Sequence, residues 1–250
     1  MYIGLVREPF SHFVSSFIYY TNVCKLPDLL KIPRNDTASS ISWYLGNKAF
    51  IDKNHTREGK VDWTHMRNGM AYDFGFPIND IRNASRMKID KFVKKLDVEF
   101  DLVIVLEHLD ESLVLMRRML RWSMKDILYI LQSNKGVINS TDVKNSLTGR
   151  DRQRHREWEP VDIALYNHFL NKLLKQVYKQ GASFQKELED FKLTKHAAMQ
   201  FCEDKKIKEE LKWTIESTNE EITINSYDCT MLETIGLKFT PLIKQSKKYS

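Results

Sequence analysis

Short apolar runs followed by amphipathic stretches set the pattern of the first half of the chain. Residues 2–6 form an apolar run, and after Pro9 the aromatic residues Phe13 and Phe17 recur at helical spacing. The same order returns at residues 100–106, where an apolar run precedes another amphipathic stretch. Each run has the length of a strand, and each stretch fits a helix with one buried face. Two strand-to-helix units predict an α/β fold with a partly parallel sheet flanked by helices.

The segment between these units, residues 22–79, is irregular and carries several prolines and glycines. A long insertion of this kind in a compact domain is usually functional. Within it we expect a short helix over residues 38–45. A further helix over residues 80–96 leads into the second strand.

The second half of the chain is predicted to be mainly helical. Residues 132–152 are polar and rich in Ser and Asn, which predicts a loop. After Pro160 a long amphipathic helix is expected, with its apolar face formed by Ile163, Leu170, Leu174 and Val177.

Gly181 permits a break in the helical pattern, and a second helix is expected over residues 183–213. The tail contains a β-like piece at residues 221–227. We therefore divide the chain into a domain over residues 1–180 and a helical C-terminal extension with a tail over residues 181–250.

Composition narrows the class of protein. The chain has 250 residues, of which 42% are apolar and 29% charged, so it can bury a substantial core. The net charge of +6 and the pI near 9.0 suit an anionic ligand, but no basic motif of a nucleic-acid reader is present. No apolar run approaches about 18 residues, and residues 1–20 lack the features of a signal peptide.

Four N-glycosylation sequons favour a lumenal location. The chain has 14 asparagines, for which chance predicts only about one or two sequons. The four acceptor residues are Asn35, Asn54, Asn83 and Asn139.

The three cysteines, Cys24, Cys202 and Cys229, show neither a C-x-x-C spacing nor a neighbouring histidine cluster, which argues against a zinc site. Two interpretations remain open. All three are buried thiols, or a disulfide joins Cys202 to Cys229 and pins the tail.

Arg7 follows the first predicted strand, and the carboxyl ends of strands in open α/β sheets are where ligands bind. Ser15 lies eight residues later on the predicted helix, so its hydroxyl and the Arg7 guanidinium could converge on one anion such as phosphate. The alternative is that Arg7 forms an ordinary salt bridge.

Several stretches resemble one family. "VREPFSHFVSSFIYY" (residues 6–20) resembles the 3′-phosphate-binding motif of sulfotransferases that use 3′-phosphoadenosine 5′-phosphosulfate. "RNGMAYDFGF", "DESLVL" and "REWEPVDIALYNHFLNKLLKQV" follow in the order found in the galactose-3-O-sulfotransferase family, which includes galactosylceramide sulfotransferase. The resemblance extends from residue 1 to about residue 180 and implies a P-loop-type sulfotransferase fold.

The resemblance implies transfer of a sulfuryl group to O3 of a galactose on a glycolipid or glycoprotein, in the Golgi lumen and without a metal. Arg7 and Ser15 would hold the 3′-phosphate of the donor. The family carries upstream a membrane anchor and a phosphate loop for the 5′-phosphosulfate, and we find neither here. We therefore expect an N-terminally incomplete chain that is inactive by itself. The alternative is a catalytically dead nucleotide- or glycan-binding paralogue.

For the acceptor, the candidates are His65, Arg67 and Asn68. His65 could act as a base because the ordinary pKa of histidine is about 6.5, whereas Arg67 and Asn68 could hydrogen-bond sugar hydroxyls. The alternative is structural, with a tight turn that places Gly69 at a positive φ while Arg67 pairs with Asp73.

The basic segment over residues 148–158 is the other candidate for binding an anion. Because sulfotransferases commonly close the nucleotide site with a late basic loop, Arg154 is expected to contact the nucleotide. A solvated loop is the alternative. Trp158, Tyr166 and Phe169 are expected in the core, and Glu107 is expected to cap the following helix together with Asp110 rather than to act in catalysis.

Overall fold

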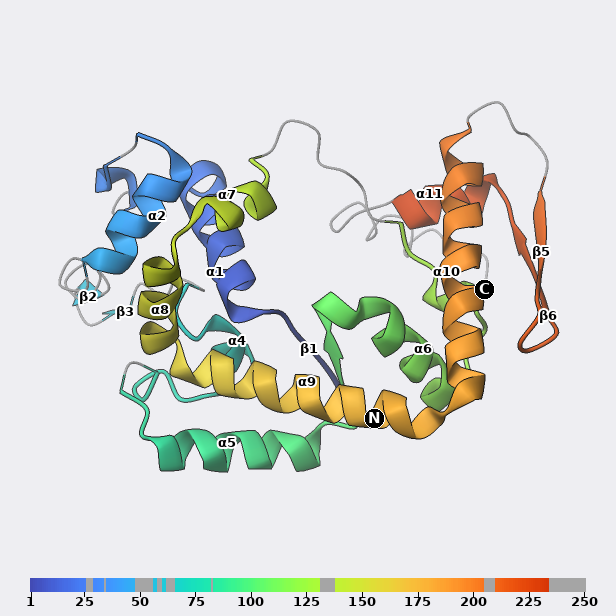
Figure 1. The fold of residues 1–250 in the computed structure, drawn as a ribbon, viewed down its shortest axis with the longest axis horizontal. Helices are drawn as coiled ribbons and strands as arrows, with labels where there is room; N and C mark the ends of the chain where they lie inside the picture. The colour runs from blue at the N-terminus through green and yellow to red at the C-terminus, as the bar shows by residue number, and fades with distance from the viewer. Residues whose placement is uncertain are drawn as a thin grey trace. The chain divides into compact units, whose positions relative to one another are not determined.

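A computed structural model describes residues 1–25, 29–33, 35–47, 56–57, 60–61, 66–81, 83–130, 138–204 and 210–233 (Figure 1). The contacts within the chain divide it into two compact units. Unit 1 comprises residues 1–107 and 136–174, and unit 2 comprises residues 108–135 and 175–250. Each unit therefore combines an early and a late stretch of the sequence.

Unit 1 contains the predicted parallel sheet. Strand β1 (Ile3–Val6) pairs in parallel with β4 (Leu102–Val105), and Val6 lies opposite Val105 at their carboxyl ends. The described residues are mostly helical around this small sheet, which is compatible with an α/β sulfotransferase fold. Gly4 is required in β1 because a Cβ atom there would lie 2.6 Å from the ring of Phe74.

Helix α1 (Pro9–Ile18) follows β1 directly, as predicted, with Pro9 in its first turn. The carboxylate of Glu8 caps the helix. Phe10, Phe13 and Phe17 form its buried face. The other described elements of unit 1 are η1 (Tyr19–Val23), η2 (Leu29–Lys31), α2 (Thr37–Gly46), β2 (Thr56–Arg57), β3 (Lys60–Val61), α4 (Gly69–Asp73), α5 (Arg86–Glu99), α7 (Ser140–Ser146), α8 (Gly149–Trp158) and the part of α9 (Pro160–Gln180) up to residue 174.

The insertion contains the predicted short helix, α2. The helix predicted over residues 80–96 begins later, at Arg86, because Ser85 accepts a hydrogen bond from the backbone of Lys88 and so provides the N-cap.

The predicted loop over residues 132–152 is wrong where the structure describes it. Residues 140–146 form α7, capped by Asn139, and residues 149–158 form α8. Thr148 and Asp151 build a capping box that satisfies two backbone N–H groups at the start of α8. The strongly basic segment is therefore a helix rather than a loop.

The long helix after Pro160 forms as predicted, but its buried face differs. The residues packed into the core include Val161, Leu165, Phe169 and Leu173, whereas Leu174 is 44% exposed. The prediction counted apolar residues only. The actual face also buries polar Asp162 and Tyr166, which rotates it away from the expected one.

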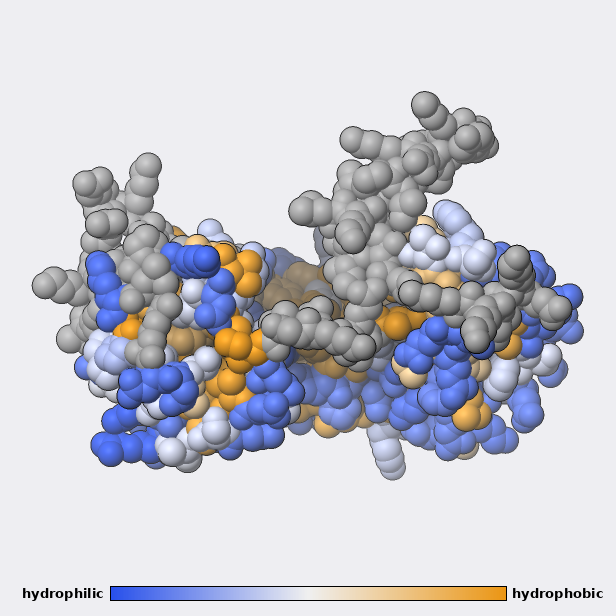
Figure 2. Space-filling view, turned by 90° about the horizontal axis from the view of Figure 1, so that it is seen from above, coloured by the Kyte–Doolittle hydropathy of each residue, from blue (hydrophilic) through white to orange (hydrophobic). Residues whose placement is uncertain are grey.

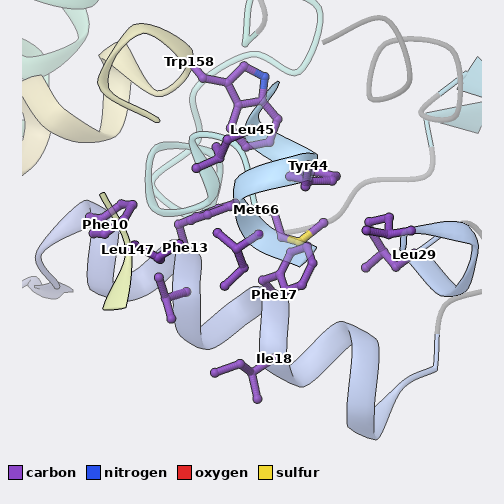
Figure 3. Close-up of a cluster of buried hydrophobic side chains, with 13 residues drawn as sticks. Phe10, Phe13, Phe17, Ile18, Leu29, Tyr44, Leu45, Met66, Leu147 and Trp158 are labelled. Carbon is purple, nitrogen blue, oxygen red and sulfur yellow. The ribbon is translucent and has the colours of Figure 1, made fainter. Parts of the chain in front are cut away.

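The core of unit 1 is aromatic (Figure 3). Phe13 of α1 meets the ring of Tyr44 from α2 at 6.2 Å and that of Trp158 from α8 at 5.9 Å. Trp158, Tyr166 and Phe169 are buried, as expected. The first contact is stacked and the second is edge-to-face, and together they join α1, α2 and α8 into one packed group.

Unit 2 is built from α6 (Leu109–Leu120), η4 (Lys125–Ile127), α10 (Ala182–Glu203), the hairpin β5 (Leu211–Ile215) and β6 (Glu220–Ile224), and α11 (Ser226–Glu233). The predicted β-like piece is β6. The helix predicted over residues 183–213 ends at Glu203, and residues 211–215 pair with β6 instead. Gly181 has a φ of 72° and marks the expected break.

Charged side chains hold unit 2 together. Arg117 pairs with Glu187 at 3.1 Å and with Glu220 at 2.9 Å, and so connects α6 with α10 and the hairpin. Asp110 accepts hydrogen bonds from Tyr129 and Lys195 rather than capping α6. The expected cap by Asp110 and Glu107 is therefore wrong, and the N-cap residue of α6 is His108, which has no side-chain cap.

The Sγ atoms of Cys202 and Cys229 form a disulfide between α10 and α11, and Cys24 is an exposed free thiol. The interpretation as three buried thiols is therefore wrong. In the part of the chain that the structure describes, no helix is long and apolar enough to cross a membrane. Hydrophilic side chains cover most of the described surface seen in Figure 2, with smaller hydrophobic patches between them.

The disulfide generates a stability prediction. Replacing Cys202 and Cys229 together by Ser should lower the free energy of unfolding by about 3 kcal/mol, because the bridge closes a loop with a sequence separation of 27 residues. Urea unfolding of protein made in an oxidising compartment measures this, with Cys24→Ser as the control that keeps the bridge. Alkylation of Cys202 and Cys229 without prior reduction would contradict the prediction.

Candidate functional site

Arg7 lies at the carboxyl edge of the parallel sheet, directly after β1. Its backbone N–H points at the sulfur of Met70 in α4, with N and Sδ 3.2 Å apart. The side chain is half-buried. Within the described residues its guanidinium has neither an ion pair nor a hydrogen bond, so the salt-bridge alternative finds no support.

Ser15 lies about two turns into α1 and is half-buried. Its hydroxyl makes no hydrogen bond to any described residue. Ser11 precedes it by four residues and therefore shares its side of the helix. The two groups expected to hold a phosphate, the Arg7 guanidinium and the Ser15 hydroxyl, are thus both available to a ligand.

The first turn of α1 is already occupied by a negative charge. The carboxylate of Glu8 accepts hydrogen bonds from the backbone of Phe10 at 2.9 Å and of Ser11 at 2.8 Å. Burial raises the pKa of Glu8, but the bonds from Ser11 and Phe10 and the charge of Lys144 outweigh it and hold the pKa below the ordinary range. An external anion must therefore be bound by side chains rather than by this helix end.

Lys144 of α7 reaches the same place, since its Nζ donates to the hydroxyl of Ser11 at 2.9 Å. Arg152 of α8 lies 4.6 Å over the ring of Phe10 and donates to the carbonyl of Lys144 at 2.8 Å. Sequence reasoning included Arg152 only as part of the basic segment over residues 148–158 and missed Lys144, because only the fold brings α7 and α8 to the start of α1.

Arg154 points elsewhere on α8. Its guanidinium lies 3.9 Å from the carboxylate of Asp151, and a Cβ atom on Gly46 would come within 3.1 Å of its Nη1. Arg154 therefore lies against the end of α2. Its expected contact with the nucleotide remains a hypothesis, and in this structure Lys144 and Arg152 lie nearer the start of α1.

Asn68 and Asp162 cap each other's helices. The Oδ1 atom of Asn68 accepts from the backbone of Val161 at 3.0 Å and of Asp162 at 3.1 Å, at the start of α9. In return the Asp162 carboxylate accepts from the backbone of Met70 at 3.1 Å and of Ala71 at 2.7 Å, at the start of α4. We call this arrangement the reciprocal cap. It satisfies four buried N–H groups that would otherwise lack partners.

The acceptor candidates lie at or next to this cap. Asn68 is fully buried and its Nδ2 donates to the carbonyl of Ile81 at 2.9 Å, so the structure gives it a structural role. Its φ is 51°, and the expected positive φ at Gly69 is therefore wrong. Arg67 donates from Nε to the carbonyl of Trp158 at 3.2 Å and lies 5.3 Å over its ring. His65 lies outside the described residues.

Three ionisable side chains are buried around the end of α8. His155 is 1% exposed, and Glu159 and Asp162 are 0% exposed. Burial lowers the pKa of His155 to about 4 and raises that of Asp162 to about 8, with the charge of Glu159 adding to the latter shift. Burial also raises the pKa of Glu159 well above its ordinary value. At neutral pH His155 is therefore uncharged.

Glu107 follows the second strand of the sheet and lies in the short helix η3 (Leu106–His108). Its Oε1 accepts from the backbone N–H of Glu8 at 3.0 Å, and its carboxylate also bonds the hydroxyl of Tyr166. These two contacts, rather than a helix cap, fix Glu107 at the carboxyl edge.

Three of the sequon asparagines, Asn35, Asn83 and Asn139, are exposed, and Asn54 lies outside the described residues. The side chain of Asn139 also caps α7 by accepting from the backbone of Thr141 at 2.9 Å. Exposure at the three sites is compatible with glycosylation, which stays a prediction.

The reciprocal cap can be tested by removing one half of it. Asn68→Ala should lower the free energy of unfolding by about 3 kcal/mol, because it leaves buried N–H groups and a carbonyl without partners. Asn167→Ala, at an exposed position of α9, is the matched control and should change it by less than about 0.5 kcal/mol. Urea unfolding measures both, and equal stability of the two variants would refute the role of the cap.

Comparison with known proteins gives one consistent family. The family model for galactose-3-O-sulfotransferase matches residues 1–216. Human galactose-3-O-sulfotransferase 2 is 31% identical over 70% of this chain and 40% of its own length. Mouse galactose-3-O-sulfotransferase 3 is 26% identical over 81% of this chain and 44% of its own length. Bovine galactosylceramide sulfotransferase is 27% identical over 76% of this chain and 39% of its own length.

The chain spans less than half the length of these curated relatives. No solved structure matches it significantly. Because the family model covers most of the chain, from the first strand through β5, the match includes both the Arg7 motif and the reciprocal cap. The chain belongs to the galactose-3-O-sulfotransferase family.

Proposed function

We propose that this protein takes part in transferring a sulfuryl group from 3′-phosphoadenosine 5′-phosphosulfate to the 3-hydroxyl of a galactose residue. The acceptor would be a glycolipid or a glycoprotein glycan, and the site of action the Golgi lumen. Residues 1–250 would contribute the groups that hold the 3′-phosphate of the donor. Family membership supports the reaction class, and the names of two relatives specify galactose O3 or galactosylceramide.

One observation carries the donor assignment. Arg7 sits at the carboxyl edge of a parallel sheet, within the motif that resembles the 3′-phosphate site, and its guanidinium is unpaired among the described residues. A guanidinium binds phosphate through two parallel, charge-assisted hydrogen bonds. The hydroxyl of Ser15 supplies a further donor, and Lys144 adds positive charge at the start of α1.

The chemistry explains why positioning is the main task of such residues. Sulfuryl transfer breaks the bond between sulfur and the bridging phosphate oxygen and forms a bond to the acceptor oxygen, whose proton must be removed. Holding the donor in line with the acceptor contributes much of the rate. The fold supports this by fixing Arg7 to the sheet and, through its backbone N–H, to Met70 of α4.

On the acceptor side we propose Arg67 as a contact to sugar hydroxyls. The backbone carbonyl and the ring of Trp158 hold its guanidinium in place. A role of His65 as the base stays a hypothesis. A direct role of Asn68 would require a rearrangement that frees its buried carboxamide.

The donor assignment is tested by nucleotide binding. Arg7→Ala should weaken the affinity for adenosine 3′,5′-bisphosphate about 30-fold, since a bidentate charge-assisted contact contributes about 2 kcal/mol. Arg150→Ala removes the same charge at an exposed position of α8 and should leave the affinity within about twofold. Isothermal titration calorimetry measures both, and equal affinities of the two variants would sink the assignment.

A second test concerns turnover. The proposed contacts reach the 3′ end of the donor only, whereas bonds break at the 5′-phosphosulfate, so residues 1–250 alone are expected to transfer no sulfate. Transfer of radiolabelled sulfate to lactose or galactosylceramide measures this. Turnover by residues 1–250 would show that the donor site has been placed wrongly.

A further inference from the structure

A cavity of about 170 Å³ lies in unit 1, where the end of α1, η2 and the start of α2 meet. Its inner wall is apolar and is formed by the buried side chains of Phe17, Leu29 and Ile32. Its outer part is polar, and the exposed residues Asn22 and Asp36 place it at the surface. Since a cavity of about 150 Å³ accepts one six-membered ring such as benzene, this cavity has room for a single ring.

Two polar side chains of the cavity have no partner in the described part of the chain. Neither the carboxamide of Asn22 nor the hydroxyl of Thr37 makes a hydrogen bond there. The carboxylate of Asp36 accepts from the backbone N–H of Ser39 at 2.8 Å and from its hydroxyl. Because a carboxylate has about four lone pairs, Asp36 can accept further hydrogen bonds. The cavity therefore offers a carboxamide, a hydroxyl and a carboxylate to a ligand.

Hydrogen bonds to the backbone fix the walls of this cavity. The hydroxyl of Thr21, in η1, donates to the carbonyl of Phe17 at 2.7 Å. On the side of α2, the hydroxyl of Ser40 donates to the carbonyl of Pro33 at 2.8 Å and so ties the preceding loop to the helix. Preformed walls of this kind are typical of ligand sites. The turn η1 is also π-helical, and such turns are frequent at functional sites.

The lining of the cavity favours a sugar ring over a nucleotide. A pyranose has C–H groups that suit an apolar wall and hydroxyls that both donate and accept hydrogen bonds. Since a carboxylate only accepts, Asp36 suits the hydroxyls of a neutral sugar. The same carboxylate would repel the phosphates of adenosine 3′,5′-bisphosphate, and no described residue of the lining carries a positive charge that would offset this.

We propose that this cavity is a subsite for the acceptor and binds one pyranose ring of the glycan, with the ring hydroxyls bonded to Asn22, Asp36 and Thr37. The inference rests on the proposed function, which supplies the class of acceptor. It gives helix α1 a role toward both substrates. Ser15 lies on the helix for the donor, and Phe17, near the end of the helix, contributes to the wall for the acceptor.

The experiment is an NMR titration of the chain with lactose in the absence of nucleotide. Labelled methyl groups of Leu29 and Ile32 report on the apolar wall, and those of Leu188, buried in unit 2, are the reference. Asn35→Gln is present in every sample, so that no sugar attached at this predicted glycosylation site competes. We expect lactose to shift the methyl signals of Leu29 and Ile32 and to leave those of Leu188 unchanged.

Two variants test the polar groups. Asp36→Asn keeps an oxygen for the N–H of Ser39 but removes the charge, and it should weaken the affinity for lactose about tenfold, because hydrogen bonds to charged groups are stronger. Asn22→Ala removes an exposed carboxamide and should weaken it about fivefold. Asn167→Ala removes the same group at an exposed position of α9 and should leave it within about twofold.

Three results would overturn the inference. Lactose leaves the methyl signals of Leu29 and Ile32 unchanged, both cavity variants bind lactose as the Asn167→Ala control does, or adenosine 3′,5′-bisphosphate shifts these signals more strongly than lactose. The donor assignment is tested separately. A chain that binds lactose in the cavity, but whose nucleotide affinity does not change in Arg7→Ala, would support the subsite and refute the donor assignment. Nucleotide binding without lactose binding would refute the subsite alone.

Discussion

The reciprocal cap of Asn68 and Asp162 holds the starts of α4 and α9 in place within unit 1. Asn68 satisfies the first N–H groups of α9, and Asp162 satisfies those of α4, although 94 residues separate the two side chains. Buried N–H groups at a helix start have no partner within the helix, so each helix can be buried there only with the other present. The sulfur of Met70, at the start of α4, in turn contacts the backbone N–H of Arg7.

The cap has an electrostatic cost that explains the unusual chemistry around it. The side chains of Asp162 and Glu159 are both excluded from water, and this burial raises the pKa of both carboxyl groups. Replacing such groups by apolar ones is often neutral for stability. Buried polar groups, however, specify one arrangement, since a half-satisfied network is unfavourable. Burying these polar groups lowers the stability, but it also fixes one arrangement of α4, α8 and α9.

Local patterns predicted the elements whose signal lies within a few residues. The apolar run before Arg7, the proline in the first turn of α1 and the break at Gly181 all appear in the structure. Helix α8 was missed because its segment is very polar and its start depends on the pair Thr148 and Asp151.

The remaining features depend on contacts that no local pattern contains. Cysteine spacing could not decide between a disulfide and free thiols. The family resemblance pointed to Arg7 and Ser15, yet neither it nor the hydropathy pattern indicated that Asn68 would be buried against Val161. The buried face of α9 was misjudged for the same reason. Asp162 is a polar residue, yet it is buried because its carboxylate accepts hydrogen bonds from the backbone of α4.

The distribution of partners among the charged groups supports the proposal that Arg7 binds the phosphate of the donor. Glu8 fills the N-terminus of α1, so the helix end itself offers no anion site. Arg152 is stacked on Phe10 and bonded to a carbonyl, and Arg154 faces Asp151. In the part of the chain that the structure describes, each of these basic groups at α8 thus has a partner, whereas the guanidinium of Arg7 has none. The half-buried guanidinium of Arg7 therefore keeps its hydrogen-bond donors available to an anion, which supports the proposed donor site.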